Sequence, residues 1–147
     1  FELSTAEVTG NTYDLLVRLD LGDTSKVKGD LADSWSVSDD GLTYTFKLKP
    51  GLKFASGNPI TAADVAYSFE RAVKLDKSPA FIIDQFGISG DNVTEKAKAV
   101  DDTTFQFIVD KAYAPSFVLN CLSATVASVL DAKLVKEHVA AVTPSAD

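Results

Sequence analysis

The sequence predicts an α+β fold in which antiparallel β-hairpins pack with helices. Two stretches, residues 43–49 and 103–109, alternate apolar and polar side chains. A period of two is typical of strands that bury one face. Both stretches follow a pair of aspartates typical of a tight turn, so hairpins are expected. Between them, residues 61–75 space their apolar side chains as an amphipathic α-helix does.

The composition is that of one globular domain. The 147 residues are 46% hydrophobic and 24% charged, which suffices for a core. No apolar run approaches the roughly 20 residues that cross a bilayer. A net charge of −7 argues against a nucleic-acid partner, which would need clustered Lys and Arg. The chain begins at Phe1 and has no methionine, so a removed leader fits the sequence and nothing indicates the cytoplasm.

The N-terminal part, residues 4–20, is predicted to form a short helix that leads into a strand. Ser4 or Thr5 can cap this helix, and Glu7 stands at capping-box distance from Ser4. Residues 21–30 contain two glycines and several polar side chains, which is the composition of a loop.

Residues 31–38 and 43–49 are predicted to form the first hairpin. The turn holds Asp39, Asp40 and Gly41, and glycine there accepts a positive φ. Two adjacent carboxylates could also suggest a reacting pair or a metal site. Such a pair would need a third group, a pocket and different surroundings for its two members. We therefore interpret both aspartates as turn residues that bond nearby backbone N–H groups.

Residues 61–75 are the clearest predicted helix, and they follow turns at Pro50-Gly51 and residues 56–59. Thr61 is a natural N-cap, and Asp64 lies where a carboxylate favours the helix dipole. One apolar stripe is expected to pack on the hairpin sheet: Val65, Phe69, Ala72 and Val73. The opposite face is expected to meet water through Glu70, Arg71 and Lys74.

The second half of the chain repeats the hairpin pattern. Residues 100–102 precede an alternating run, as residues 37–40 do, with Thr103 and Thr104 in place of the glycine. The two hairpins can pair in one antiparallel sheet. Pro115 then opens an apolar helix through Ser123, and a short strand-like stretch follows. A final helix is expected over residues 131–139, capped by Asp131.

The chemistry of an enzyme is not evident in this sequence. Metal sites need several ligands at workable spacing, and no such set or phosphate-binding glycine loop is present, so no metal or cofactor is expected. The lone Cys121 is interpreted as a small buried hydrophobe, and His138 as a surface residue near a helix end. Two alternatives remain open: a small hydrolase that uses His138 with Cys121 or a serine, and a receptor or chaperone-like interaction module.

Residues 29–72 resemble a known family. The run GDLADSWSVSDDGLTYTFKLKPGLKFASGNPITAADVAYSFERA is similar to the signature of the extracytoplasmic solute-binding proteins of the oligopeptide, dipeptide and nickel type, the family 5 binding proteins of ABC importers. The matching features are Leu31-Ala32, Ser34-Trp35, Asp40-Gly41, residues 45–49, Lys53-Phe54 with Gly57, and Thr61-Ala62 with Asp64-Val65. Residues 13–20 and 99–117 resemble flanking family segments, although Leu15 replaces a family glycine.

The resemblance implies part of lobe I of a periplasmic-binding-protein-like fold (type II, cluster C). Family members have two lobes that close on the ligand around a hinge, and this chain stops before their GTGPY-like segment. Residues 1–147 are therefore expected to form a single partial domain, an N-terminal lobe fragment. The resemblance implies capture of a peptide or similar solute, without catalysis, for ABC permease subunits in the membrane. The place of action would be periplasmic or extracytoplasmic, with or without a lipid anchor.

The resemblance also indicates ligand-lining residues. In the family, later regions mostly hold the charged ends of a peptide. Two stretches of this chain match ligand-lining positions: Phe1, Glu2 and Leu3, and Ala80 or Phe81, where the family often presents an aromatic side chain. For Phe81, ordinary core packing is the alternative. Because relatives carry peptides, nickel complexes, oligosaccharides and opines, the sequence leaves the ligand open.

Overall fold

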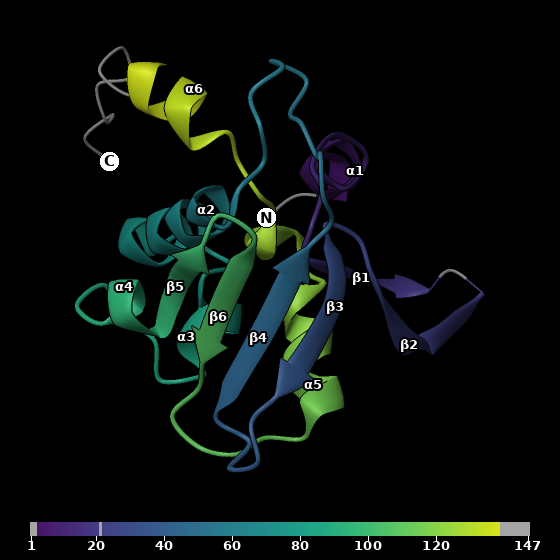
Figure 1. The fold of residues 1–147 in the computed structure, drawn as a ribbon, viewed down its shortest axis with the longest axis vertical. Helices are drawn as coiled ribbons and strands as arrows, with labels where there is room; N and C mark the ends of the chain where they lie inside the picture. The colour runs from purple at the N-terminus through teal and green to yellow at the C-terminus, as the bar shows by residue number, and fades with distance from the viewer. Residues whose placement is uncertain (1–2, 21, 139–147) are drawn as a thin grey trace.

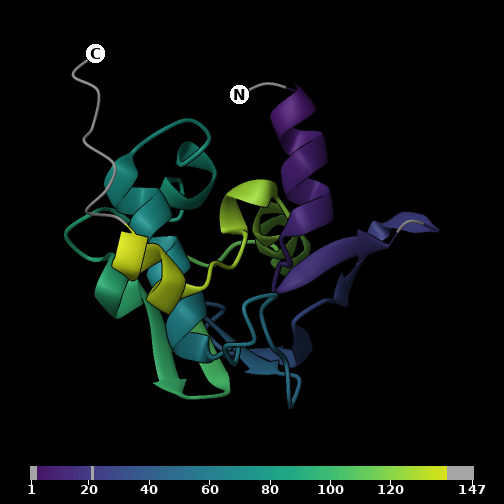
Figure 2. The same ribbon diagram turned by 90° about the horizontal axis from the view of Figure 1, so that it is seen from above.

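The computed structural model describes residues 3–20 and 22–138 (Figures 1 and 2). The helices are α1 (Leu3–Thr12), α2 (Ala62–Leu75), α3 (Phe81–Asp84), α4 (Val93–Lys96), α5 (Pro115–Leu122), the 3-10 helix η1 (Thr125–Ala127) and α6 (Ala132–His138). The strands are β1 (Val17–Asp20), β2 (Asp23–Gly29), β3 (Ala32–Val37), β4 (Thr43–Leu48), β5 (Ala97–Asp101) and β6 (Thr104–Ile108). Among the described helices, none has the length and apolar character needed to cross a membrane.

The two predicted hairpins, β3–β4 and β5–β6, form one antiparallel sheet. The strand order is β3-β4-β6-β5, so the second strand of each hairpin lies at the centre. There Phe46 pairs with Phe105, and Tyr44 with Phe107. These four side chains are fully buried, because period-two alternation turns them to the same face. The predictions of two hairpins and of one shared sheet are confirmed.

One aspartate of each predicted hairpin turn, Asp40 and Asp101, accepts a backbone N–H two residues further along the chain. Asp40 Oδ1 accepts hydrogen bonds from Ser38 Oγ at 2.6 Å and from the backbone N–H of Leu42 at 2.9 Å. These two hydrogen bonds lower the pKa of Asp40, since they favour the ionised carboxyl. Gly41 has a φ of +72° and so supplies the left-handed position of the turn. Asp39 and Asp40 are both exposed and lie on the turn.

Helix α2 covers one face of the sheet and lies mainly against β5 and β6 (Figure 1). Thr61 is the N-cap, as predicted, and the structure adds a capping box in which Asp64 Oδ2 accepts the backbone N–H of Thr61 at 2.9 Å. The Phe69 ring lies 5.3 Å from that of Phe105 and 5.6 Å from that of Phe107, centroid to centroid. Burial of a side chain of this size contributes about 1.5–3 kcal/mol. The stripe therefore packs chiefly on the second hairpin.

The prediction of a loop over residues 21–30 is wrong. Residues 23–29 form β2, which pairs antiparallel with β1 in a separate two-stranded sheet. Val17 pairs with Gly29 and Leu19 with Val27. The segment is too polar to read as a strand by itself, and pairing with β1 supplies its backbone hydrogen bonds.

The strand-like stretch predicted after α5 is also wrong, because residues 125–127 form η1. The backbone bonds locally in this segment, with the N–H of Ala127 donating to Ala124 O at 2.9 Å. The predicted helices after Pro115 and Asp131 are confirmed. The carboxylate of Asp131 caps α6 by accepting the N–H of Leu134 at 3.1 Å. Val139, the last predicted residue of that helix, lies outside the described residues.

Candidate functional site

The segment between α2 and α4 carries the second group of predicted ligand-lining residues. Helix α2 is followed by its C-cap, Asp76, which adopts a left-handed conformation with a φ of +46°. The chain then turns back, with the N–H of Ala80 donating to Lys77 O at 2.7 Å. Phe81 is the first residue of α3. A tight turn followed by a single helical turn thus places residues 80 and 81 beside the end of α2.

The neighbouring side chains of Ala80 and Phe81 differ strongly in solvent exposure. Ala80 is 2% exposed, whereas Phe81 is 65% exposed. The alternative of core packing for Phe81 is therefore wrong within this chain, and its ring is available to a ligand or to another surface. Phe1 and Glu2 lie outside the described residues, and Leu3 is the first residue of α1.

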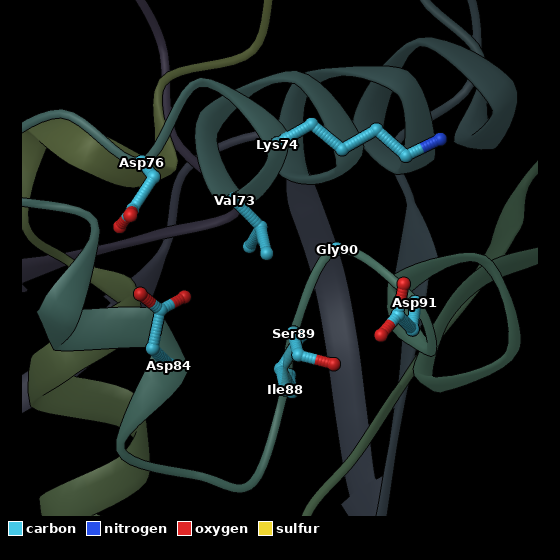
Figure 3. A pocket seen from close by; sticks show the side chains of 8 residues that line it. All are labelled: Val73, Lys74, Asp76, Asp84, Ile88, Ser89, Gly90 and Asp91. Atoms are coloured by element: carbon cyan, nitrogen blue, oxygen red, sulfur yellow. The ribbon is translucent and has the colours of Figure 1, made fainter.

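A pocket of about 580 Å³ adjoins this segment (Figure 3). Its walls come from the end of α2, from α3 and from the loop before α4: Val73, Lys74, Asp76, Asp84, Ile88, Ser89, Gly90 and Asp91. Figure 3 shows the carboxylates of Asp76 and Asp84 turned toward each other, while the Lys74 ammonium points away from them. The pocket is thus acidic on the side where α2 meets α3.

The carboxyl group of Asp84 is electrostatically the most perturbed group of this pocket. Its Oδ1 atom is buried and has no hydrogen-bond partner among the described residues. Burial raises the pKa of Asp84, and repulsion by the Asp76 charge raises it further. Such a pocket favours a cationic or hydrogen-bond-donating group. In the described part of the chain, no set of three or more His, Cys, Asp or Glu residues could hold a metal ion.

An aromatic cluster around Phe86, two residues after the end of α3, anchors this segment. The Phe86 ring lies 5.1 Å from that of Tyr113 and 5.8 Å from those of Phe107 and Phe117. The Tyr113 hydroxyl lies 3.0 Å from both the backbone oxygen of Gln85 and Asp110 Oδ1. Aromatic pairs at these separations add to the free energy gained by burial. Aromatic packing therefore supports the segment that carries the pocket and Phe81.

The two residues of the hydrolase alternative lie in different surroundings. Cys121 is half-buried, and burial raises the pKa of its thiol. Its sulfur accepts a hydrogen bond from Gln85 Nε2 at 3.5 Å. The exposed His138 has its Nδ1 atom 2.8 Å from the backbone oxygen of Leu134. A nucleophilic cysteine needs a lowered pKa and an adjacent base, and these contacts supply neither.

The sequence did not mark any residue of this pocket as functional; Val73 and Lys74 were noted only as parts of the predicted helix. Asp76, Asp84 and Asp91 are spread over sixteen positions and read as ordinary surface carboxylates. The one usable signal was their proximity in sequence to Ala80 and Phe81. A prediction would also have required the turn that brings α3 back against the end of α2.

Comparison with known proteins gives the family of the chain. Residues 26–143 match the model described as "Bacterial extracellular solute-binding proteins, family 5 Middle". Among curated proteins, the probable D,D-dipeptide-binding periplasmic protein DdpA of Escherichia coli is 38% identical over 137 residues. The dipeptide-binding protein of Lactococcus lactis is 34% identical over 141 residues. The alignments cover 90% of this chain, but only 24% and 25% of those proteins, so the chain spans about a quarter of their length.

Solved structures agree with this match. The substrate-binding domain of an oligopeptide ABC transporter from Bacillus anthracis superposes with a TM-score of 0.79 and 31% identity, over 94% of this chain and 28% of that one. DppA from Helicobacter pylori, solved with the peptide STSA, gives a TM-score of 0.74 and 30% identity, over 96% and 29% of the two chains. These proteins are described as binding proteins or transporter components rather than as enzymes. This chain belongs to the bacterial extracellular solute-binding proteins of family 5.

Proposed function

We propose that this chain forms part of the solute-capturing lobe of a binding protein that delivers a peptide or similar small solute to an ABC importer. The match to the family model over residues 26–143 is the observation that carries the proposal. The names of the dipeptide-binding relatives and the peptide in the Helicobacter pylori structure support a peptide as the solute.

Residues 1–147 would then be one partial domain of a longer, two-lobed protein. The share of the relatives' length that the chain covers, about a quarter, supports this division. The protein would act outside the cytoplasmic membrane, in the periplasm or held by a lipid anchor, and would transfer its solute to the membrane permease. No chemistry on the solute is required, because closure of two lobes around a ligand is enough to signal loading.

Phe1, Glu2, Leu3 and Phe81 are the proposed ligand-lining residues, and Ala80, which is 2% exposed, is proposed to support Phe81 from below the surface. The exposed ring of Phe81 supports its part in this, because an aromatic side chain on a rigid helix offers apolar contact area at little cost in conformational entropy. Ala80 would act as the small buried residue that fixes the start of α3. A lobe fragment buries only one side of a ligand, whereas small-molecule sites bury most of the ligand surface.

Isothermal titration calorimetry with mixed di- to pentapeptides tests this function. The protein expressed from its full reading frame is expected to bind at least one peptide with micromolar or lower Kd. Residues 1–147 alone should bind at least about 100-fold more weakly, because half of the ligand stays in water. Micromolar binding by residues 1–147 alone would contradict the half-site, and no binding by the full protein would contradict peptide capture.

Phe81→Ala tests the ligand-lining assignment in the same assay. We expect weaker peptide binding by the full protein, whereas Val100→Ala, which shortens another exposed apolar side chain on β5, should leave the Kd unchanged. Equal affinities for the two variants would remove Phe81 from the site.

A further inference from the structure

The pocket in Figure 3 combines apolar and acidic walls. Val73 and Ile88 contribute buried apolar side chains to its lining. Asp76 and Asp84 turn their carboxylates toward each other on one side, and Asp91 lies on the other. The volume of about 580 Å³ lies within the range of small-molecule sites. Such a lining suits a side chain with an apolar stem and a charged end, because the stem covers apolar surface while the charge meets a carboxylate.

The carboxylates of this pocket lack a cationic partner in the part of the chain that the structure describes. There, Asp76, Asp84 and Asp91 make no ion pair. The nearby Lys74 is bonded to Glu70 at 2.6 Å, and its ammonium points away from the facing carboxylates. The Oδ1 atom of Asp84 is buried and has no hydrogen-bond partner among the described residues. A buried carboxylate oxygen without a donor costs free energy, which a donor entering the pocket would recover.

The repulsion between Asp76 and Asp84 indicates the charge of the missing partner. Burial and the Asp76 charge both raise the pKa of Asp84. A cation bound at the facing carboxylates would replace this repulsion by attraction to both. The guanidinium of arginine is suited to this place, since its five N–H donors form a planar fork that can bond more than one carboxylate oxygen.

The pocket lies beside the proposed ligand-lining residue Phe81. Phe81 and Asp84 are three positions apart on α3, and residues at this spacing are neighbours on the surface of a helix. The helical turn that joins them is closed by the N–H of Gln85, which donates to Phe81 O at 3.2 Å. A peptide that lies against the exposed ring of Phe81 would therefore carry its side chains within reach of the pocket.

We propose that Asp84 and Asp76 form a specificity subsite that takes an arginine side chain of the captured peptide. This inference rests on the proposed function, because the peptide is the solute proposed there. Asp84 supplies the main contact through its buried oxygen, and the exposed Asp76 adds a weaker one. The protein then selects among peptides by the charge of one side chain, and neutral peptides bind without this contribution.

Isothermal titration calorimetry with matched peptide pairs tests the subsite. The protein expressed from its full reading frame is titrated with alanine peptides of two to five residues. Each peptide carries, at one position, either arginine or citrulline, which has the shape of arginine without its charge. We expect the arginine peptide to bind at least about tenfold more tightly at one position or more, the lower end of what a hydrogen bond to a charged group contributes.

Asp84→Asn removes the charge of the proposed subsite and keeps the shape of the side chain. We expect it to reduce the preference for arginine over citrulline to about threefold or less, which the exposed Asp76 can still supply. The Tm of the variant, measured beside the affinities, separates a lost contact from a lost fold.

Asp102→Asn is the matched control, because it removes the same charge from an exposed turn beside the start of α2. By the length of the helix, this turn lies roughly 20 Å from Asp76. The preference for arginine should be the same in Asp102→Asn and in the unchanged protein.

Equal affinities for the arginine and citrulline peptides at every position would overturn the subsite while leaving peptide capture intact. A preference that survives Asp84→Asn would overturn it as well, since other residues would then bind the guanidinium. An equal loss of preference in Asp102→Asn would also refute it, because the overall charge of the chain would be the cause. If none of the peptides binds, the proposed function is contradicted, and this inference with it.

Discussion

The carboxylate of Asp64 joins the first turn of α2 to the backbone of Ala132, at the start of α6. Its Oδ1 atom accepts the N–H of Ala132 at 3.1 Å, while Oδ2 accepts the N–H and Oγ1–H of Thr61 at 2.9 and 2.7 Å. One turn along α2, Ser68 Oγ accepts the N–H of Leu130 at 2.9 Å. Asp64 and Ser68 are both buried. A helix cap thus also fixes a segment 68 positions away in the sequence.

Asp64→Ala should destabilise the protein by about 2–4 kcal/mol, because it removes a helix cap and leaves the N–H of Ala132 without its acceptor. Urea unfolding followed by the fluorescence of Trp35, the single tryptophan, measures the loss. Glu7→Ala, which removes an exposed carboxylate on α1, is the control and should change stability by less than about 0.5 kcal/mol. A loss below about 1 kcal/mol for Asp64→Ala would show that the link to α6 adds nothing.

The Asp101 carboxylate should make stability depend on pH. Hydrogen bonds from Thr104 Oγ1 at 2.7 Å and the N–H of Thr103 at 2.8 Å, with further help from Lys47, lower its pKa from 3.8 to about 2. A folded-state pKa below the unfolded value stabilises the protein above about pH 5, and this contribution is lost as the pH falls toward 2. We expect the urea midpoint to fall over this range, and less steeply in Asp101→Asn. Asp102→Asn is the control, since its side chain has none of these partners; equal slopes for the two variants would contradict the assignment.

The Asp84 carboxyl should have the opposite effect. Burial and the Asp76 charge raise its pKa, so the ionised form destabilises the folded state, and this penalty disappears as the pH falls and the carboxyl is protonated. Asp84→Asn should therefore raise the urea midpoint at pH 7 but not at pH 3. Asp76→Asn should act in the same direction by removing the repelling charge. Asp91→Asn, on the other side of the pocket, is the control. For Asp84→Asn, an increase of the urea midpoint at pH 3 as large as that at pH 7 would refute the electrostatic cause.

Gly87→Ala should be more harmful than Gly51→Ala, although both glycines have a φ near +73°. A Cβ at residue 87 would lie 2.6 Å from Asp110 Cβ, whereas one at residue 51 would meet no atom within 4 Å. The left-handed conformation alone costs about 1–2 kcal/mol, and the contact with Asp110 should add to it. We expect losses of about 1 kcal/mol for Gly51→Ala and about 3 kcal/mol for Gly87→Ala in urea unfolding. Equal losses would mean that Asp110 moves aside freely.

The local signals of the sequence were enough to predict both hairpins and α2. The alternation of residues 43–49 and 103–109, the turn at Asp40-Gly41 and the N-cap at Thr61 each act within a few positions of the chain. Such features depend on neighbouring residues, so the sequence contains all the information that they need. The same run of residues carried the family resemblance that the comparisons confirm.

The hairpins, the capped helix and the family could therefore be predicted from the order of the residues alone. Three features became visible only in the folded chain: residues 23–29 form a strand, the carboxylates of Asp76 and Asp84 face one pocket, and Arg71 lines two cavities. These properties depend on contacts between groups that are not neighbours in the sequence. Backbone pairing, desolvation and charge repulsion arise only when folding brings such groups together, and no periodicity of the sequence encodes which ones will meet.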